Sequence, residues 1–179
     1  MKHLMVLFSV VATTFWSLPA RAEAPAQSYV QESYALFGSG GISYVDRTLS
    51  MAASFGARRV VNHTALEAEV GIAAVIPSSG PIGSAGQVRV AGGGAVVLSS
   101  NTALTIQANV GVAGSGGSQP VMTALVGPRV SMQTFVNDHV YFEPALHGGC
   151  IWAWDPKVGT SSMTFSGYVA NTYSFGYVF

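Results

Sequence analysis

The sequence predicts an all-β protein, specifically an eight-stranded antiparallel up-and-down transmembrane β-barrel. Only 9% of its 179 residues are charged, whereas soluble domains carry roughly 25% charged residues. Apolar side chains alternate with small or polar ones, which is the period of a strand whose two faces differ. The last seven residues place an aromatic ring at every second position, at Tyr173, Phe175, Tyr177 and Phe179. A strand with one face in lipid has this pattern.

The N-terminal segment has the features of a secretory signal peptide. Lys2 precedes an apolar run over residues 4–11, and Ala20-Arg21-Ala22 is a small-x-small cleavage site. The run is too short to span a bilayer as a helix, and no later apolar stretch reaches that length. The expected division is a signal peptide over residues 1–22, a periplasmic N-terminal extension over 23–32 and an outer-membrane barrel domain over 33–179.

Turn-forming residues divide the remaining chain into eight segments. We expect strands over residues 33–45, 49–61, 65–77, 86–98, 103–114, 120–136, 139–154 and 161–179. Each segment exceeds the roughly 9–11 residues that a tilted strand needs to cross a membrane. The second, fourth and sixth connectors are tight and polar, whereas the third, fifth and seventh are longer and rich in Gly, Pro and Ser. The first connector, residues 46–48, is short and breaks this trend. Short turns at one rim and longer loops at the other place both termini in the periplasm.

Alternation assigns the two faces of each strand. Leu104, Ile106 and Val110 point one way, and Gln107 and Asn109 point the other. The alternative is a soluble β-sandwich or jelly roll, whose polar face would be a wet surface rich in Lys and Glu. Here the polar face is mostly Gly, Ala, Ser, Thr, Asn and Gln. Small residues suit the narrow interior of an eight-stranded barrel, so the pattern favours the barrel.

The same alternation turns most of the remaining charges inward. We expect a salt-bridge network in the lumen made by Arg58, Glu67, Glu69, Arg89, Arg129, Glu143 and His147, with Gln107, Asn109 and Tyr141 as hydrogen-bond partners. Folding the hairpin about residues 62–64 places Arg58 opposite Glu67. Three cations balance three carboxylates, and an unpaired buried ion would cost several kcal/mol. This network is expected to fill and stiffen the barrel; a gated proton or ion path is the alternative.

No catalytic, cofactor or metal site is predicted. Glu143 and His147 point inward from one strand but stand about 13 Å apart along it, too far for a direct hydrogen bond. Cys150 is the single cysteine, and the scattered histidines lack metal-site spacing. A near-neutral charge balance argues against nucleic acid as a partner.

Aromatic residues mark the expected membrane edges. One girdle is formed by Tyr44, Trp152 and Trp154, and the other by Tyr34 and the C-terminal aromatic residues. Asn171 falls on the lipid-facing side of the last strand. Either it lies near an interface, or a β-bulge between Val169 and Tyr173 changes the alternation.

With these features the chain resembles the superfamily of small outer-membrane β-barrels that contains the OmpA membrane domain and OmpX. The resemblance rests on the signal ending Ala20-Arg21-Ala22, the eight segments, the inward Arg/Glu set and the C-terminal run. It implies the outer membrane of a Gram-negative bacterium. It also implies that the barrel-assembly machinery reads the C-terminal strand, with the assembly signal at Tyr173, Phe175, Tyr177 and Phe179.

The expected function is therefore non-enzymatic. The protein would be a monomer with a plugged polar lumen and no cofactor, in contact with outer-membrane lipids, and it would serve membrane integrity or surface interaction. One alternative is an enzyme acting on lipid A or phospholipid. Family lipid A deacylases carry a His-x-Ser motif, but His147-Gly-Gly149 has no Ser. The other alternative is a small pore. The connectors are short for an adhesin, and no peptidoglycan-binding domain is expected after Phe179.

Overall fold

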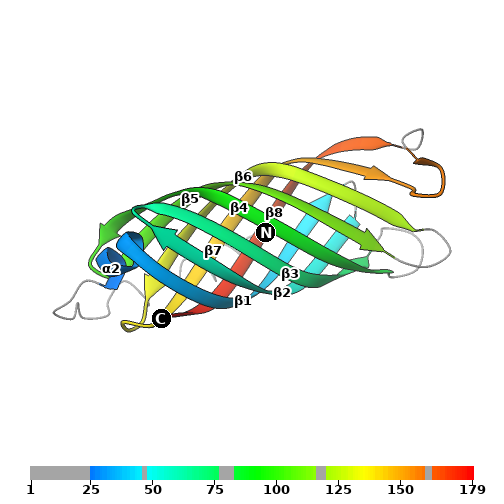
Figure 1. Ribbon diagram of the computed structural model, residues 1–179. Coiled ribbons are helices and arrows are strands. Elements are labelled where there is room, and N and C mark those ends of the chain that lie inside the picture. The colour runs from blue at the N-terminus through cyan, green and yellow to red at the C-terminus, as the bar shows by residue number, and fades with distance from the viewer. Residues whose placement is uncertain (1–24, 46–47, 77–82, 116–119, 160–162) are drawn as a thin grey trace, which may run out of the picture.

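The structure is a computed structural model that describes residues 25–45, 48–76, 83–115, 120–159 and 163–179. Over these ranges the chain forms eight strands that close into one barrel (Figure 1). The elements are α2 (Pro25–Gln31), β1 (Glu32–Val45), β2 (Thr48–Val61), β3 (Thr64–Ile76), β4 (Gly83–Ser99), β5 (Thr102–Ser115), β6 (Val121–Phe135), β7 (Val140–Trp154) and β8 (Thr164–Val178).

The barrel has the predicted up-and-down topology. Each strand pairs antiparallel with the next along the chain, and β8 pairs with β1 to close the sheet. The observed strand ends lie within three residues of those that the sequence predicts. The expected fold is therefore confirmed. The β-sandwich alternative is wrong, because the strands form one closed sheet and not two stacked sheets.

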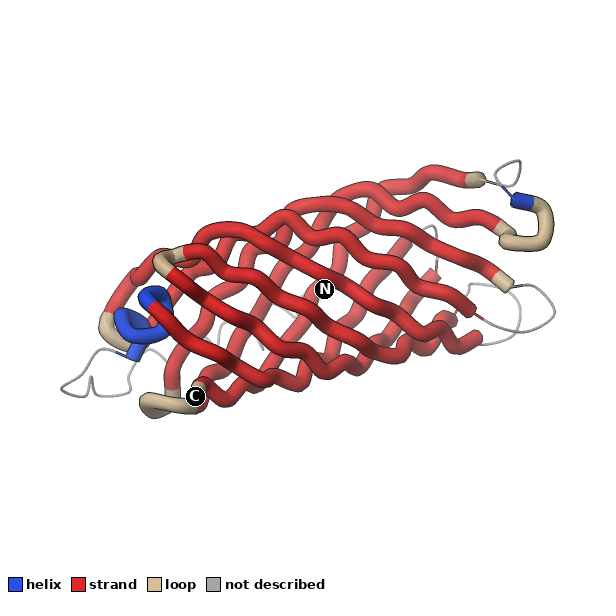
Figure 2. The backbone as a smooth tube through the Cα atoms, in the orientation of Figure 1, coloured by secondary structure: helices blue, strands red, loops and turns tan. Residues whose placement is uncertain are grey.

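The two ends of the barrel differ in their connectors (Figure 2). One end, called here the short-turn end, has tight turns and the helix α2. Asn62 and His63 form the two-residue turn between β2 and β3, with φ values of 45° and 65°. Two positive φ angles match a type I′ hairpin turn. The opposite end, called the loop end, has the longer connectors, apart from the β1–β2 connector, which spans only residues 46–47. The expected signal peptide and parts of these connectors, with Arg47, lie outside the described residues.

The two faces of the sheet have the reverse of the polarity found in a water-soluble protein. On β3 the outward side chain of Ile72 is 71% exposed, whereas the inward Glu67 is 5% exposed. On β5, Ile106 and Val110 are likewise exposed and Gln107 is buried. Large apolar side chains exposed over a whole surface, with ions buried beneath them, are the opposite of what water selects. The outward face is therefore suited to an apolar solvent.

The helix α2 lies in the short-turn end of the barrel. Pro25 is its first residue, a position where the missing N–H removes no hydrogen bond. Ala26, Tyr29 and Val30 lie on one face of the helix and are buried. The amide of Asn62 donates to the carbonyl of Gln31 at 2.7 Å. Residues that the sequence analysis leaves outside the barrel thus occupy its end. No helix in the described residues is long and apolar enough to cross a membrane.

The strand β8 decides one of the two alternatives for Asn171, the β-bulge. Its pairing with β7 and with β1 runs without a shift through Asn171. The proposed bulge between Val169 and Tyr173 is therefore wrong. Asn171 is exposed on the outer face, beside Ile42 of β1 and Leu146 of β7. Both neighbours are apolar and exposed.

Candidate functional site

The interior of the barrel contains a closed ring of ion pairs. Arg58 Nη2 lies 2.6 Å from Glu67 Oε2, and Arg58 Nη1 lies 2.7 Å from Glu143 Oε2. Arg129 Nη1 lies 2.9 Å from Glu67 Oε2, and Arg129 Nη2 lies 2.6 Å from Glu143 Oε1. Each cation therefore contacts both carboxylates. We call Arg58, Glu67, Arg129 and Glu143 the ion ring; its side chains are at most 1% exposed.

The ion ring connects strands that are far apart around the barrel. Arg58 and Glu67 are direct partners across the β2–β3 hairpin. Arg129 and Glu143 come from β6 and β7 and reach the hairpin across the interior. Two positive and two negative charges cancel within the ring, which offsets part of the cost of removing them from water. Removing any member leaves an uncompensated charge in a dry interior.

A second cluster lies next to the ring. Glu69 and Arg89 are ladder partners on β3 and β4, and their side chains form an ion pair. Arg89 Nη2 also lies 3.4 Å from Glu67 Oε1, which joins this cluster to the ion ring. The hydroxyls of Ser39 and Ser54 donate to Glu69 Oε1. The Arg89 side chain is 14% exposed, compared with 0% for Arg58.

His147 contacts Arg89 and Thr172, not a carboxylate. Arg89 Nη1 lies 2.8 Å from His147 Nδ1, and His147 Nε2 lies 2.8 Å from Thr172 Oγ1. A guanidinium only donates, so the imidazole nitrogen that faces it accepts. Arg89 Nη1 lies nearer to Nδ1 than to Nε2, at 2.8 Å against 3.2 Å, which favours Nδ1 as the acceptor and leaves the Nε2–H to donate to Thr172. A general base in a triad has a carboxylate on this nitrogen instead. This geometry does not equip His147 to activate Thr172 as a nucleophile. Glu143 is engaged in the ion ring.

An aromatic layer lies in the interior between the ion ring and the short-turn end. The Tyr29 ring centroid lies 5.3 Å from that of Phe135 and 6.1 Å from that of Tyr141. Arg58 Nη1 donates to the Tyr29 hydroxyl at 2.9 Å, and the Arg58 guanidinium lies 5.3 Å from the Phe37 ring centre. Burial raises the pKa of the Tyr29 phenol above its ordinary value. We call Tyr29, Phe37, Phe135 and Tyr141 the aromatic layer.

The sequence analysis did not identify Tyr29. A signal was present, because Ala26, Tyr29 and Val30 have helical spacing after Pro25. Tyr141, expected as a hydrogen-bond partner, has instead its ring 5.9 Å from the Arg58 guanidinium. Within the described residues its hydroxyl has no hydrogen-bond partner.

The two other expected hydrogen-bond partners behave differently from each other. Gln107 Oε1 accepts from Arg129 Nη1 at 2.7 Å and so contacts the ion ring. Asn109 donates instead to the carbonyl of Gly127 at 2.6 Å and accepts from the Tyr168 hydroxyl at 3.4 Å. Gln107 therefore contacts the ion ring, whereas Asn109 connects β5 to β6 and β8 nearer the loop end.

The expected assembly signal lies on the outer face at the short-turn end. Its members are exposed: Tyr173, Phe175, Tyr177 and Phe179. The amide of Phe179 donates to the carbonyl of Tyr34 at 2.9 Å, so the last residue is held against β1. Cys150 is a free, half-buried thiol. Among the described residues, no group of His, Cys, Asp and Glu side chains could hold a metal ion.

Comparison with known proteins finds similarity in structure but not in sequence. No family model matches the chain, and no curated protein matches it. Neisserial surface protein A (NspA) matches with a TM-score of 0.57 and 10% identity, over 83% of this chain and 97% of that chain. OprG from Pseudomonas aeruginosa gives 0.53 and 9%, over 84% and 97%. Ail, the attachment invasion locus protein of Yersinia pestis, gives 0.50 and 10%, over 83% and 97%.

These matches concern the fold. At 9–10% identity they show that the chain has the fold of the small outer-membrane β-barrels. The coverage of both chains is high, so the likeness extends over the whole barrel. At this level of identity the matches do not extend to individual residues, so the ion ring and the aromatic layer are described for this chain alone.

Proposed function

We propose that this chain is an integral outer-membrane β-barrel protein with a closed, non-conducting and non-enzymatic interior. In this proposal it maintains the membrane or presents its loop end to the outside. The observation on which the proposal depends is the inverted polarity of the barrel: apolar side chains cover the outer face, and the ion ring is buried inside. A bilayer is the solvent in which this arrangement is stable.

The outer membrane is favoured over other bilayers by two features of the chain. The expected signal peptide over residues 1–22 would direct the chain out of the cytoplasm. The C-terminal aromatic residues on β8 resemble the signal of the barrel-assembly machinery, which would act as a partner during insertion. The folds of NspA, OprG and Ail support the same location.

Two layers of side chains support a closed lumen. The ion ring joins β2 and β3 to β6 and β7 through contacts of 2.6–2.9 Å across the interior. Between the ion ring and the short-turn end, the aromatic layer and the helix α2 occupy the interior. Barrels of this size have an interior just wide enough for side chains, so continuous water would require both layers to move.

The environment of His147 supports a non-enzymatic role. The imidazole lies between Arg89 and Thr172, and the inward carboxylate on its own strand, Glu143, is held by two arginines. Neither residue is placed as a free general base. Release of fatty acid from lipid A or phospholipid by the purified protein, lost in His147→Ala, would contradict this part of the proposal.

The names of the structural neighbours favour a role at the cell surface. NspA is named a surface protein, and Ail is named for attachment and invasion. In a deletion strain, leakage of the outer membrane to detergent indicates a role in membrane integrity. If a barrel with every loop-end connector replaced by a short turn restores resistance, the barrel alone is sufficient. If it does not restore resistance, the loops carry the function.

The direct test of a closed lumen is a planar-bilayer recording of the refolded protein. Insertion is verified first by gel migration, because a folded barrel migrates differently before and after boiling. We expect this shift and no steady open events. Identical migration of boiled and unboiled samples overturns the membrane barrel. A normal shift together with sustained conductance overturns the closed lumen alone.

A further inference from the structure

A polar side chain stands at the centre of the apolar outer face. Asn171 is the middle residue of β8, with seven strand residues on either side. Its outward neighbours along the strand are Val169 and Tyr173, and its partners across the sheet are Ile42 and Leu146. Its outward neighbours are therefore apolar apart from the Tyr173 hydroxyl, and Asn171 lies seven residues from either end of β8.

Within the described residues the Asn171 carboxamide has no hydrogen-bond partner. It has two N–H donors and a carbonyl acceptor that must be satisfied. A polar group in a hydrocarbon environment without such a partner is costly. The middle of a bilayer offers only acyl chains and no water. If the barrel spans a membrane, as proposed above, this position calls for a polar partner from another protein molecule.

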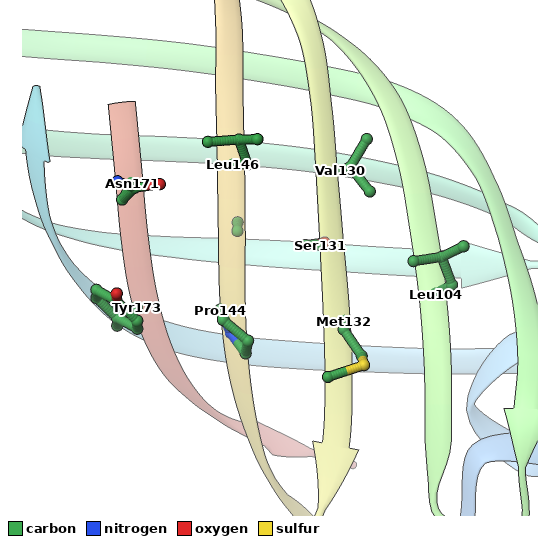
Figure 3. Close-up of a pocket in the computed structure, with 9 residues that line it drawn as sticks. Leu104, Val130, Ser131, Met132, Pro144, Leu146, Asn171 and Tyr173 are labelled. Atoms are coloured by element: carbon green, nitrogen blue, oxygen red, sulfur yellow. The ribbon is translucent and has the colours of Figure 1, made fainter. Parts of the chain in front are cut away.

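The outer face is hollowed beside Asn171 (Figure 3). The hollow measures about 220 Å³ and is lined mainly by apolar side chains, among them Leu104, Val130, Met132 and Leu146. Pro144 also lines the hollow, and proline has no N–H to give to a sheet. The β6–β7 ladder is interrupted there, between the pairs Ser131–Ala145 and Thr134–Phe142. The surface is therefore concave next to the Asn171 carboxamide.

We propose that this surface, formed by β6, β7 and β8, is the interface of a homodimer. A two-fold axis near Asn171 would bring the two carboxamides together, and a carboxamide is self-complementary because it both donates and accepts. Polar side chains associate membrane segments in this way. The closed barrel has no free strand edge, so the copies must meet through outer-face side chains. The hollow beside Asn171 accommodates an apolar side chain of the second copy.

This inference rests on the proposed membrane location, and it departs from the monomer that the sequence analysis expects. A lipid is the other possible occupant of the hollow. The ester and hydroxyl groups of lipids lie in the interfacial regions of a bilayer, however, whereas Asn171 is the middle residue of its strand. The carboxamide therefore favours a second copy over a lipid.

The experiment measures the oligomeric state of the refolded protein in detergent and in vesicles. Sedimentation equilibrium should show a dimer, and Asn171→Leu should raise the dimer dissociation constant about tenfold or more. Val90→Leu is the matched control: Val90 is exposed on the outer face of β4, outside the proposed interface. It should leave the dissociation constant unchanged.

A second measurement fixes the geometry. In a Cys150→Ser background, mild oxidation should link Asn171→Cys into a dimer and leave Val90→Cys monomeric. A monomer at all concentrations, or equal cross-linking of both variants, overturns the inference. A monomer that retains a stoichiometric lipid, lost in Asn171→Leu, overturns it in favour of the lipid. Because the heat shift on gels tests the barrel separately, failure to dimerise leaves the proposed function intact.

Discussion

The two ends of the barrel interior are built differently. At the short-turn end the inward side chains are buried, and they include the rings of Phe37, Phe135 and Tyr141 and a residue from outside the sheet, Tyr29. At the loop end they are half-buried, as at Ala113, Thr123 and Leu125. The ion ring lies between these two regions.

This difference separates two properties of the molecule. In the proposed function, closure depends on the ion ring and the aromatic layer, whereas on the loop-end side of the ring the Arg89 side chain is 14% exposed. Substitutions in the ring or between it and the short-turn end should therefore change both the stability of the barrel and its permeability. Substitutions between the ring and the loop end should change neither strongly. The predictions below test this division, and each uses a matched residue as its control.

The largest effect is expected from Arg58→Ala. The change leaves Glu67 and Glu143 with one arginine between them in a buried site, and breaking such a pair costs about 3–5 kcal/mol. Arg59→Ala is the control, because Arg59 is the next residue but lies on the outer face with its guanidinium 5.0 Å from the Tyr34 ring centre. That contact is worth about 1 kcal/mol or less.

The measurement is the free energy of unfolding by urea in lipid vesicles. Equal losses for Arg58→Ala and Arg59→Ala would show that the ion ring does not hold the barrel together. A larger loss for the inward arginine supports the division between ring and surface.

The next effect is expected from Tyr29→Ala. The change removes a buried ring and the acceptor of an Arg58 hydrogen bond. Deletion of a buried aromatic side chain costs about 3–5 kcal/mol of stability. We expect a loss at the lower end of this range because α2 is short. Tyr34→Ala is the control, since the Tyr34 side chain is 51% exposed.

Tyr29→Ala should also produce brief openings in planar-bilayer recordings, because the short-turn end loses its filling. If Tyr29→Ala shows no openings and is as stable as the unaltered protein, Tyr29 has no part in closing the lumen.

The sequence predicts the strands well because each strand is specified locally. Alternation sets the two faces, and a two-residue turn at Asn62 and His63 sets the Arg58–Glu67 pairing. The complete ion ring was not predictable in the same way. Arg129 and Glu143 meet Arg58 only because the strands tilt and shift register around the closed sheet, which depends on every connector together. One hairpin can be aligned from its turn, but a barrel cannot.

The helix α2 was missed for a different reason. Seven residues are too few for a periodic pattern to stand out, and an isolated helix of that length is not stable in water. Its helicity depends on the barrel end that receives Tyr29 and Val30. Local sequence therefore gave only the weak signal of Pro25 and the apolar spacing after it.

A smaller effect is expected from Gly176→Ala. Gly176 is the ladder partner of Tyr141, and a Cβ at Gly176 would overlap the Tyr141 ring. Overpacking of this kind costs about 1–3 kcal/mol. Gly86→Ala is the control, because a Cβ at Gly86 has no neighbouring atom within 4 Å. If the two variants unfold at the same urea concentration, the aromatic layer is less tightly packed than the structure shows.

The smallest effect on stability is expected from Phe179→Ala, and here the comparison is between the two ends of one strand. Phe179 directly follows β8 at the short-turn end and is 70% exposed, and Phe165 lies near the start of β8 at the loop end and is 63% exposed. Each loses about 1–2 kcal/mol of transfer energy from water to an apolar environment when truncated. Refolded in vitro, the two variants should therefore be equally stable.

In cells the same two variants should differ. If the assembly machinery reads the C-terminal residue, Phe179→Ala should lower the amount of barrel in outer-membrane fractions several-fold, while Phe165→Ala leaves it unchanged. Equal amounts of both variants would mean that the terminal aromatic residue serves only as lipid contact. Because the two substitutions remove the same side chain from the same face, any difference between them must come from recognition during insertion, not from the stability of the finished barrel.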